Sequence, residues 1–316
     1  MRAVAQRIGQ LVVVLFLVTL FTALLLSMLP GDIGETIIPF GSDEQREAVR
    51  DDLGVNDPIW TQYGRWVGNF VTGDFGKFYR QGNVTEVSDR IQSTFPVSLQ
   101  LMVYAQLLAL VIAIPLGVYT AHRAGSVADK ATNTTAYALL AVPNFVLALV
   151  LAYVVGVELG WLPPQGYVRP TENLGEHIRS MILPSISLAV GQIAVYMRLL
   201  RTDLVATLQQ DFILMAKSKG ISERRVLWRH ALRPSSLTLL TVAGLNVGTL
   251  IGGALIIEII FSLDGMGRLV FDAISERQVV AIQSLVAIIA IAYVLVNFLV
   301  DLLYAAVDPR IRHGRG

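Results

Sequence analysis

Long apolar runs alternate with polar segments along this chain of 316 residues. The apolar runs cover approximately residues 8–29, 96–121, 132–157, 183–200, 236–261 and 279–307. An α-helix needs about 20 mainly apolar residues to cross the roughly 30 Å hydrocarbon core of a bilayer. The pattern therefore predicts an all-α polytopic membrane protein with six transmembrane helices, forming a single domain over residues 1–316.

The polar segment at residues 201–234 indicates how the chain is oriented. Between Arg198 and Arg233 there are eight basic residues and only three acidic ones. Loops rich in Lys and Arg stay in the cytoplasm, so this segment is expected on the inner face. Alternation then places residues 30–95 outside, where eleven acidic residues outnumber six basic ones. Both termini, which are basic, are expected in the cytoplasm.

The first apolar run has two interpretations, a cleaved signal peptide or a permanent span. The apolar region of a signal peptide is typically only about 7–15 residues long and ends at a small-residue cleavage site. Here residues 8–29 form a longer run, and SMLPGD follows. We therefore favour an uncleaved first span.

Composition excludes several classes of protein. The chain is 54% hydrophobic and 16% charged, whereas soluble domains carry roughly 25% charged residues. It has no cysteine, which excludes disulfides and thiolate chemistry. The four histidines show no metal-ligand spacing, and no phosphate-cradling glycine motif occurs. We expect no catalytic site, metal or cofactor on this chain.

The outer segment contains two helical patterns. Asp43–Leu53 is predicted to be a helix that Ser42 caps, because a serine at a helix start accepts a free backbone N–H. Trp60, Tyr63, Trp66 and Phe70 then recur at helical spacing. They suit an amphipathic helix at the membrane interface or an aromatic face that contacts substrate.

Ionisable residues inside the spans are few. Glu258 and Asp301 both lie near span ends, whereas a proton-coupled carrier is expected to place an acid near the bilayer midplane. Gly244, Gly248 and Gly252 recur every four residues in the fifth run. Such a stripe permits close helix packing or provides a narrow wall along a pathway, and both interpretations remain open.

The segment between the fourth and fifth runs also carries a recognisable motif. Its residues Ala216-x-x-x-Gly220-Ile221-Ser222-Glu223-Arg224-Arg225, followed by His230-Ala231-Leu232-Arg233, resemble the EAA loop of binding-protein-dependent ABC permeases. Within that group, the sequence of the segment is similar to that of the first permease subunit of dipeptide and oligopeptide importers. Nearly the whole chain shares the resemblance, including Leu29-Pro30-Gly31-Asp32, Gly73-Asp74-Phe75-Gly76 and Asp308-Pro309-Arg310. One departure is that Leu214 and Met215 stand where the general pattern has Glu-Ala.

The resemblance implies the permease fold of type I ABC importers, with a short coupling helix that docks into an ATPase subunit. It implies that Gly220 forms a tight turn between two helical pieces and that Ser222 caps the second piece. The implied coupling residues are Asp211, Ala216, Lys217, Gly220, Ser222, Glu223, Arg224, Arg225 and His230. The candidate pathway or packing residues are Gly244, Gly248, Gly252 and Glu258.

The resemblance also implies partners. They are a second homologous permease, two ATP-binding subunits or domains that hold ATP and Mg, an external substrate-binding protein, a peptide substrate and membrane lipid, with no nucleic acid. The expected location is the bacterial cytoplasmic membrane. Relatives in the family carry nickel chelates, haem, glutathione or oligosaccharides, so the cargo remains open. A secondary carrier acting alone and an intramembrane enzyme are weaker alternatives.

Overall fold

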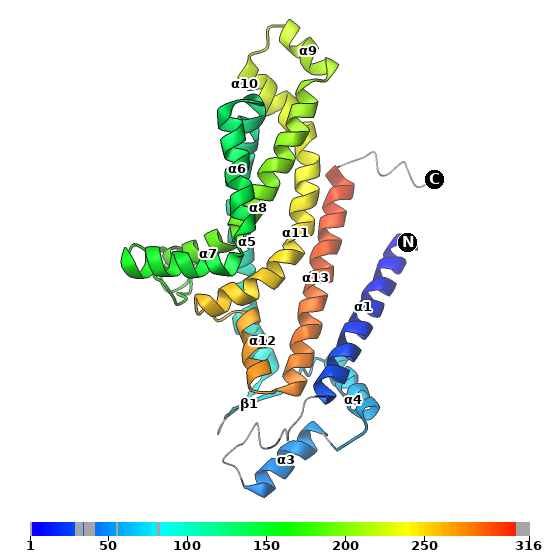
Figure 1. Cartoon of the computed structure of the whole chain (residues 1–316). Helices are drawn as coiled ribbons and strands as arrows, with labels where there is room; N and C mark the ends of the chain where they lie inside the picture. Colours follow the sequence, from blue (N-terminus) through cyan, green and yellow to red (C-terminus); the bar gives the residue numbers. More distant parts are fainter. Residues whose placement is uncertain (1, 29–33, 35–41, 55, 81–82, 308–316) are drawn as a thin grey trace. The chain divides into compact units, whose positions relative to one another are not determined.

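A computed structural model gives the fold of residues 2–28, 34, 42–54, 56–80 and 83–307. This part of the chain is almost entirely helical, with one two-stranded hairpin (Figure 1). It divides into two compact units, one of residues 1–98 and 264–295 and the other of residues 99–263 and 296–316. The motifs at residues 29–32 and 308–310 and the side chain of Asp301 lie outside what the structure describes.

The first unit combines helices with the hairpin. Its elements are α1 (Arg2–Ser27), α3 (Asp43–Leu53), α4 (Ile59–Thr72), β1 (Lys77–Arg80), β2 (Asn83–Glu86), the start of α5 (Val87–His122), α12 (Met266–Ser275) and most of α13 (Val279–Val307). The strands are antiparallel, with Lys77 opposite Glu86. Buried apolar side chains form the core, namely Phe78, Val87, Met266, Leu269, Val270, Ala273, Ala281, Ile282 and Leu285.

Two buried polar contacts fix the start of α13 within this unit. The side-chain amide of Gln278 accepts a hydrogen bond from the Tyr79 N–H at 3.1 Å and donates one to the Tyr79 carbonyl at 2.5 Å. The Gln278 side chain thereby pairs the backbone N–H and carbonyl of Tyr79 in β1, as the backbone of a neighbouring strand would. The indole N–H of Trp66 donates to Ser284 Oγ at 3.0 Å. Both contacts join segments about 200 residues apart in sequence.

The aromatic residues of α4 pack mainly inward. The rings of Tyr63, Trp66 and Phe70 follow one another with centroids 5.8 and 5.1 Å apart, and Phe16 of α1 meets Tyr63 edge-on. Of the four aromatic residues at helical spacing, Trp60 alone is largely exposed. Their main role in this unit is therefore packing.

The helix α3 is confirmed as predicted. It begins after Ser42, whose side chain accepts the Gln45 N–H, while the Gln45 side chain accepts the Ser42 N–H. This reciprocal pair is a capping box.

The second unit is organised around one long helix. It contains the rest of α5, α6 (Val127–Ala141), α7 (Asn144–Leu151), the π-helical η1 (Ala152–Glu158), α8 (Leu174–Leu208), α9 (Asp211–Ser218), α10 (Glu223–Arg225), the π-helical η2 (Val226–Ala231), α11 (Leu232–Ile260) and the end of α13. The helices α6, α7 and α11 all pack against α8. Its side chains are buried along most of its length as a result.

The expected spans correspond to helices of unequal length. Four helices in the described part of the chain are long and apolar enough to cross a membrane, and a bent pair, α6 with α7 and η1, makes a fifth candidate. The apolar part of α1, Leu11–Ser27, is shorter. The sixth run was placed correctly at residues 279–307. The fourth run was expected at residues 183–200, but α8 starts at Leu174, continues through Pro184 and ends at Leu208.

The third expected span, residues 132–157, is not one straight helix. It breaks at Val142–Pro143, and the two parts meet at 95°. Proline has no N–H, its ring clashes with the preceding turn, and it disfavours helical conformation in the residue before it. Figure 1 shows α7 leaving the direction of α6 almost at a right angle.

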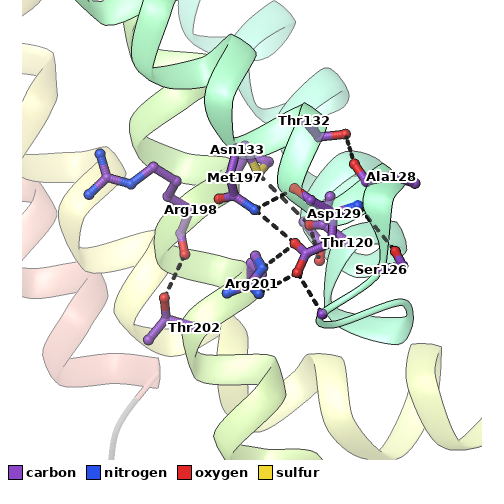
Figure 2. A network of polar contacts seen from close by, with 12 residues as sticks. Thr120, Ser126, Ala128, Asp129, Thr132, Asn133, Met197, Arg198, Arg201 and Thr202 are labelled. Atoms are coloured by element: carbon purple, nitrogen blue, oxygen red, sulfur yellow. Dashed lines mark hydrogen bonds and ion pairs between the residues drawn. The ribbon is translucent and has the colours of Figure 1, made fainter.

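A buried ion pair joins α6 to α8. The guanidinium of Arg201 donates from Nε to Asp129 Oδ1 and from a terminal nitrogen to Oδ2, both at 2.6 Å. The carboxylate also accepts the Gly125 N–H at 2.9 Å and the Asn133 side-chain amide at 2.8 Å (Figure 2). The side chain of Asp129 is only 3% exposed. Four hydrogen bonds therefore replace the water that this carboxylate gave up.

We predict that Asp129→Asn lowers the stability of the protein by about 3 kcal/mol, because removing one partner of a buried ion pair leaves the other charge uncompensated. Thermal unfolding of the purified protein in detergent measures the effect. The matched control is Asp57→Asn, which breaks an exposed pair with Arg65 and should cost less than about 1 kcal/mol. Equal shifts for the two variants would contradict the prediction.

Candidate functional site

The candidate coupling segment connects the ends of α8 and α11. Figure 1 shows α9 and α10 together at one end of these two helices. The ends are held to each other by Ser235 Oγ, which lies 2.8 Å from Thr207 Oγ1. The two ends of the segment are therefore held close together by this hydrogen bond, and α9 packs back onto η2.

The turn at Gly220 has the geometry that the resemblance implied. Its φ is +74°, in the left-handed region that glycine adopts without strain. The Gly220 N–H donates to the Lys217 carbonyl at 2.9 Å, and the Ile221 N–H donates to the Ala216 carbonyl at 3.3 Å. These two bonds form a Schellman motif. Gly220 thus ends α9 and turns the chain toward α10.

The second helical piece differs from its expected form. Ser222 stands at the N-cap position of α10, but its side chain makes no capping hydrogen bond, so that detail of the prediction was wrong. The chain then passes into the π-helical turn η2 before α11 begins. The sequence offered no signal for this π-helix. Single π-helical turns within α-helices occur frequently at functional sites.

The segment presents two faces of different character. Its inward face is apolar and buried, with Ile213 and Ala231 fully covered. The outward face of α9 is also apolar, since Phe212, Leu214 and Met215 are 46%, 54% and 56% exposed. An exposed apolar cluster on a polar segment marks an interaction site. Leu214 and Met215, the residues that depart from the general motif, belong to this cluster.

Most of the other candidate coupling residues lie on the surface of the segment. Asp211, Lys217, Gly220, Ser222, Glu223, Arg224 and Arg225 are exposed, His230 is half-buried, and Ala216 is buried. Asp211 lies in the first turn of α9, where a carboxylate favours the positive end of the helix dipole. The exposed side chains of Arg224 and Arg225 give the same segment positive charge. The arrangement suits docking to a partner.

The glycines of the α11 stripe differ in their surroundings, since Gly244 is packed against a neighbouring helix and Gly252 faces open space. A Cβ at Gly244 would come within 2.2 Å of Val300 Cγ1, so this glycine permits close packing against α13. Nothing lies within 4 Å of the corresponding position at Gly252, which is exposed. Gly248 is half-buried between them, and Glu258 is fully buried in the last turns of α11.

Sequence reasoning missed the exposed apolar cluster. The signal was present, because Phe212, Leu214 and Met215 interrupt a segment that is otherwise polar and basic. The spacing of these residues alone did not show which of them point outward, since Ile213 between them is fully buried. Only the packing of α9 onto η2 separates the two faces.

Two family models match the chain. Residues 113–313 match the binding-protein-dependent transport system inner membrane component, and residues 1–102 match the N-terminal part of the same class of membrane component. The oligopeptide transport system permease protein AppB of Bacillus subtilis is 37% identical over 94% of both chains. The dipeptide transport system permease protein DppB of Alkalihalophilus pseudofirmus is 32% identical over 98% of both chains. The glutathione transport system permease protein GsiC of Escherichia coli is 33% identical over 98% of both chains.

A solved structure supports the fold. The MetNI methionine ABC transporter, in inward-facing conformations, contains a chain that superposes with a TM-score of 0.57 at 15% sequence identity. The superposition covers 69% of this chain and 96% of that one. This chain belongs to the family of binding-protein-dependent transport system inner membrane components.

Proposed function

We propose that this chain is one transmembrane subunit of an ATP-driven importer of peptides. The observation that carries the proposal is the exposed apolar face of α9. This short helix lies where the ends of α8 and α11 are hydrogen-bonded to each other. The relatives named for oligopeptide and dipeptide transport match nearly the whole chain. The relative named for glutathione transport also handles a small peptide, so peptides are the cargo class that fits best.

In this proposal α9 is the coupling helix and docks into a cleft on an ATPase subunit. ATP and Mg bind to two such subunits or domains, a homologous second permease completes the pathway, and an external binding protein delivers the peptide. The basic segment at residues 201–234 and both termini lie in the cytoplasm, since Lys- and Arg-rich loops stay there. Six spans of one permease domain cross the cytoplasmic membrane.

The rivals are another cargo and another mechanism. Nickel chelates, haem and oligosaccharides remain alternative cargoes. A secondary carrier uses broken helices and midplane charges. The break between α6 and α7 meets the first criterion, but the sequence of α8 from 180 to 197 and of α11 from 234 to 257 contains no charged residue. ATP-driven transport therefore fits better.

We predict that the tagged chain, purified from its native membranes, brings with it a second permease and an ATPase. ATP hydrolysis by this complex should rise when peptide-loaded binding protein is added, because delivery from outside must reach the ATPase through this subunit. Uptake of a radiolabelled tripeptide into vesicles, with and without ATP, completes the test. A solitary chain that takes up peptide without ATP would be a secondary carrier and would contradict the proposal.

We predict that Met215→Asp lowers the amount of ATPase that co-purifies with the chain by about tenfold or more, because a carboxylate buried in an apolar interface loses its hydration. The matched control is Val71→Asp in α4, where the side chain is 80% exposed. It should leave co-purification unchanged. An equal ATPase yield from both variants would mean that the apolar cluster does not contact the ATPase.

We predict that Gly220→Val uncouples ATP hydrolysis from transport, whereas Gly220→Asn retains most of it. No atom lies within 4 Å of the added Cβ position, so the two variants differ only in backbone preference. A β-branched residue with φ of +74° is strained by about 1–2 kcal/mol, and asparagine tolerates this region. The ratio of peptide taken up to ATP hydrolysed is the measurement. Identical ratios for both variants would show that the turn geometry is unimportant.

A further inference from the structure

A cluster of uncharged polar side chains lies halfway along α8 and α11. The Asn246 side-chain amide donates to Gln192 Oε1 at 2.9 Å, and the Gln192 side-chain amide donates to Thr249 Oγ1 at 3.3 Å. Asn246 is the central residue of α11, and Gln192 is one residue past the centre of α8. The two helices pack against each other. This Gln192–Asn246–Thr249 cluster therefore lies near the middle of the bilayer.

Behind the cluster, the polar groups are paired within the protein. Tyr196, which is fully buried, donates from its hydroxyl to Gln106 Oε1 at 3.2 Å. The amide of Gln106 in turn donates to the Ala243 carbonyl at 3.3 Å. The front of the cluster is open, because Thr249 is exposed and Gln192 and Asn246 are only half-buried. The Gln192 amide keeps a second N–H beyond the bonds named above, whereas the Asn246 side chain also bonds Tyr196 and the Thr249 hydroxyl donates to the Asn246 carbonyl at 2.7 Å.

The exposed face around Thr249 differs from the face of the same unit that suits lipid. Along α5, Leu99, Val103, Leu107 and Val111 are all exposed and all apolar. On α11, the exposed residues Thr249 and Gly252 lie between the exposed apolar residues Leu245 and Ile256, with open space beside Gly252. Polar groups facing hydrocarbon cost free energy and are normally found facing protein or a water-filled cavity. The polar middle of this α11 face, around Thr249, therefore does not suit contact with hydrocarbon.

The break in the third span gives an independent indication of water at this depth. Ala141, Val142 and Pro143 are exposed where the helix is interrupted. The Asn144 side-chain oxygen lies 3.4 Å from the position that a Cβ at Gly191 would occupy, which places the break beside the centre of α8. Non-helical backbone at membrane depth is tolerated only inside protein or along a water-filled cavity.

We propose that Gln192, Asn246 and Thr249 line the aqueous path and hydrogen-bond to main-chain amide groups of the peptide in transit. This inference rests on the proposed function. The neighbouring stretches of α8 and α11 contain no charged residue, so the cluster offers neutral donors and acceptors that match peptide groups. Every peptide presents these groups whatever its side chains are. The cluster binds the backbone and leaves the choice of sequence to other parts of the importer.

The absence of cysteine from this chain makes the test direct, since any thiol label on its band comes from an introduced residue. The assembled importer carrying Thr249→Cys is treated in native membranes with a charged methanethiosulfonate reagent. The matched control is Leu107→Cys on the apolar α5 face. We expect T249C to react more than about tenfold faster than L107C, because the reactive thiolate forms in water and is disfavoured in hydrocarbon.

Protection of the thiol tests contact with the cargo. Tripeptide-loaded binding protein and a non-hydrolysable ATP analogue should slow the labelling of T249C, while unloaded binding protein should not. Uptake of the same tripeptide by the wild-type importer is measured alongside. Unprotected labelling with normal wild-type uptake overturns this inference alone. Absent wild-type uptake overturns peptide import and this inference together.

A second pair of variants separates a path from an interface between permeases. Gln192→Leu and Thr249→Val should assemble with their partners at wild-type yield. Their tripeptide uptake should fall about tenfold, roughly the factor for one lost hydrogen bond. Thr241→Val is the control, because the hydroxyl of Thr241 bonds only the Leu237 carbonyl of its own helix. Failed assembly of Q192L and T249V would make the cluster an inter-permease contact and overturn the proposal.

Discussion

Hydrocarbon forms no hydrogen bonds, and this constraint explains how the second unit is arranged around α8. Polar groups along that helix are favoured where they find a partner within the protein or face water, and several of them do so, although Ser185 Oγ is buried without a partner. Arg201 bonds to Asp129 in the first turn of α6, and the Tyr196 hydroxyl bonds to Gln106 on α5. Gln192, at the centre, finds Asn246 and Thr249 on α11. Three helices, α5, α6 and α11, are thus held to α8 in part by polar contacts whose loss would leave polar groups facing hydrocarbon.

Features that depend on neighbouring residues could be predicted from the sequence. The capping box at Ser42, the left-handed turn at Gly220 and the bounds of α13 all follow from local chemistry. A serine two or three residues before free N–H groups and a glycine where φ must be positive each act within about one helical turn, and an uninterrupted apolar run can be identified from contiguous residues alone. The basic coupling segment was recognisable for the same reason, because its charge and its motif are contiguous.

Features that depend on distant contacts could not be predicted. Asp129 and Arg201 are 72 residues apart, and nothing in either sequence neighbourhood selects the other as its partner. Pro143 signalled a disturbance of the third span, but proline in a membrane helix gives anything from a slight kink to a full break. Pro184 shows the opposite outcome, since α8 continues through it while packed by neighbouring helices. The prolines mark both positions in the sequence, but tertiary packing determines whether the helix breaks, as at Pro143, or continues, as at Pro184.

The continuity of α8 connects the two regions of this unit for which we propose a function, the coupling segment and the polar cluster at Gln192. Gln192 lies 16 residues before the end of α8 at Leu208, which is about 24 Å along a helix at 1.5 Å per residue. Within that length, Arg201 is clamped to Asp129 and Thr207 is bonded to Ser235. A helix fixed in this way moves as a rigid body more easily than it bends. In the proposed mechanism, motion of α9 would therefore move Gln192 together with the whole of α8. The distance from Gln192 to the opposite wall of the path would change, while the hydrogen bonds of Gln192 to α11 would stay intact. Cargo release then requires no charge to be created or neutralised at mid-depth, which fits a path that has to pass many different peptides.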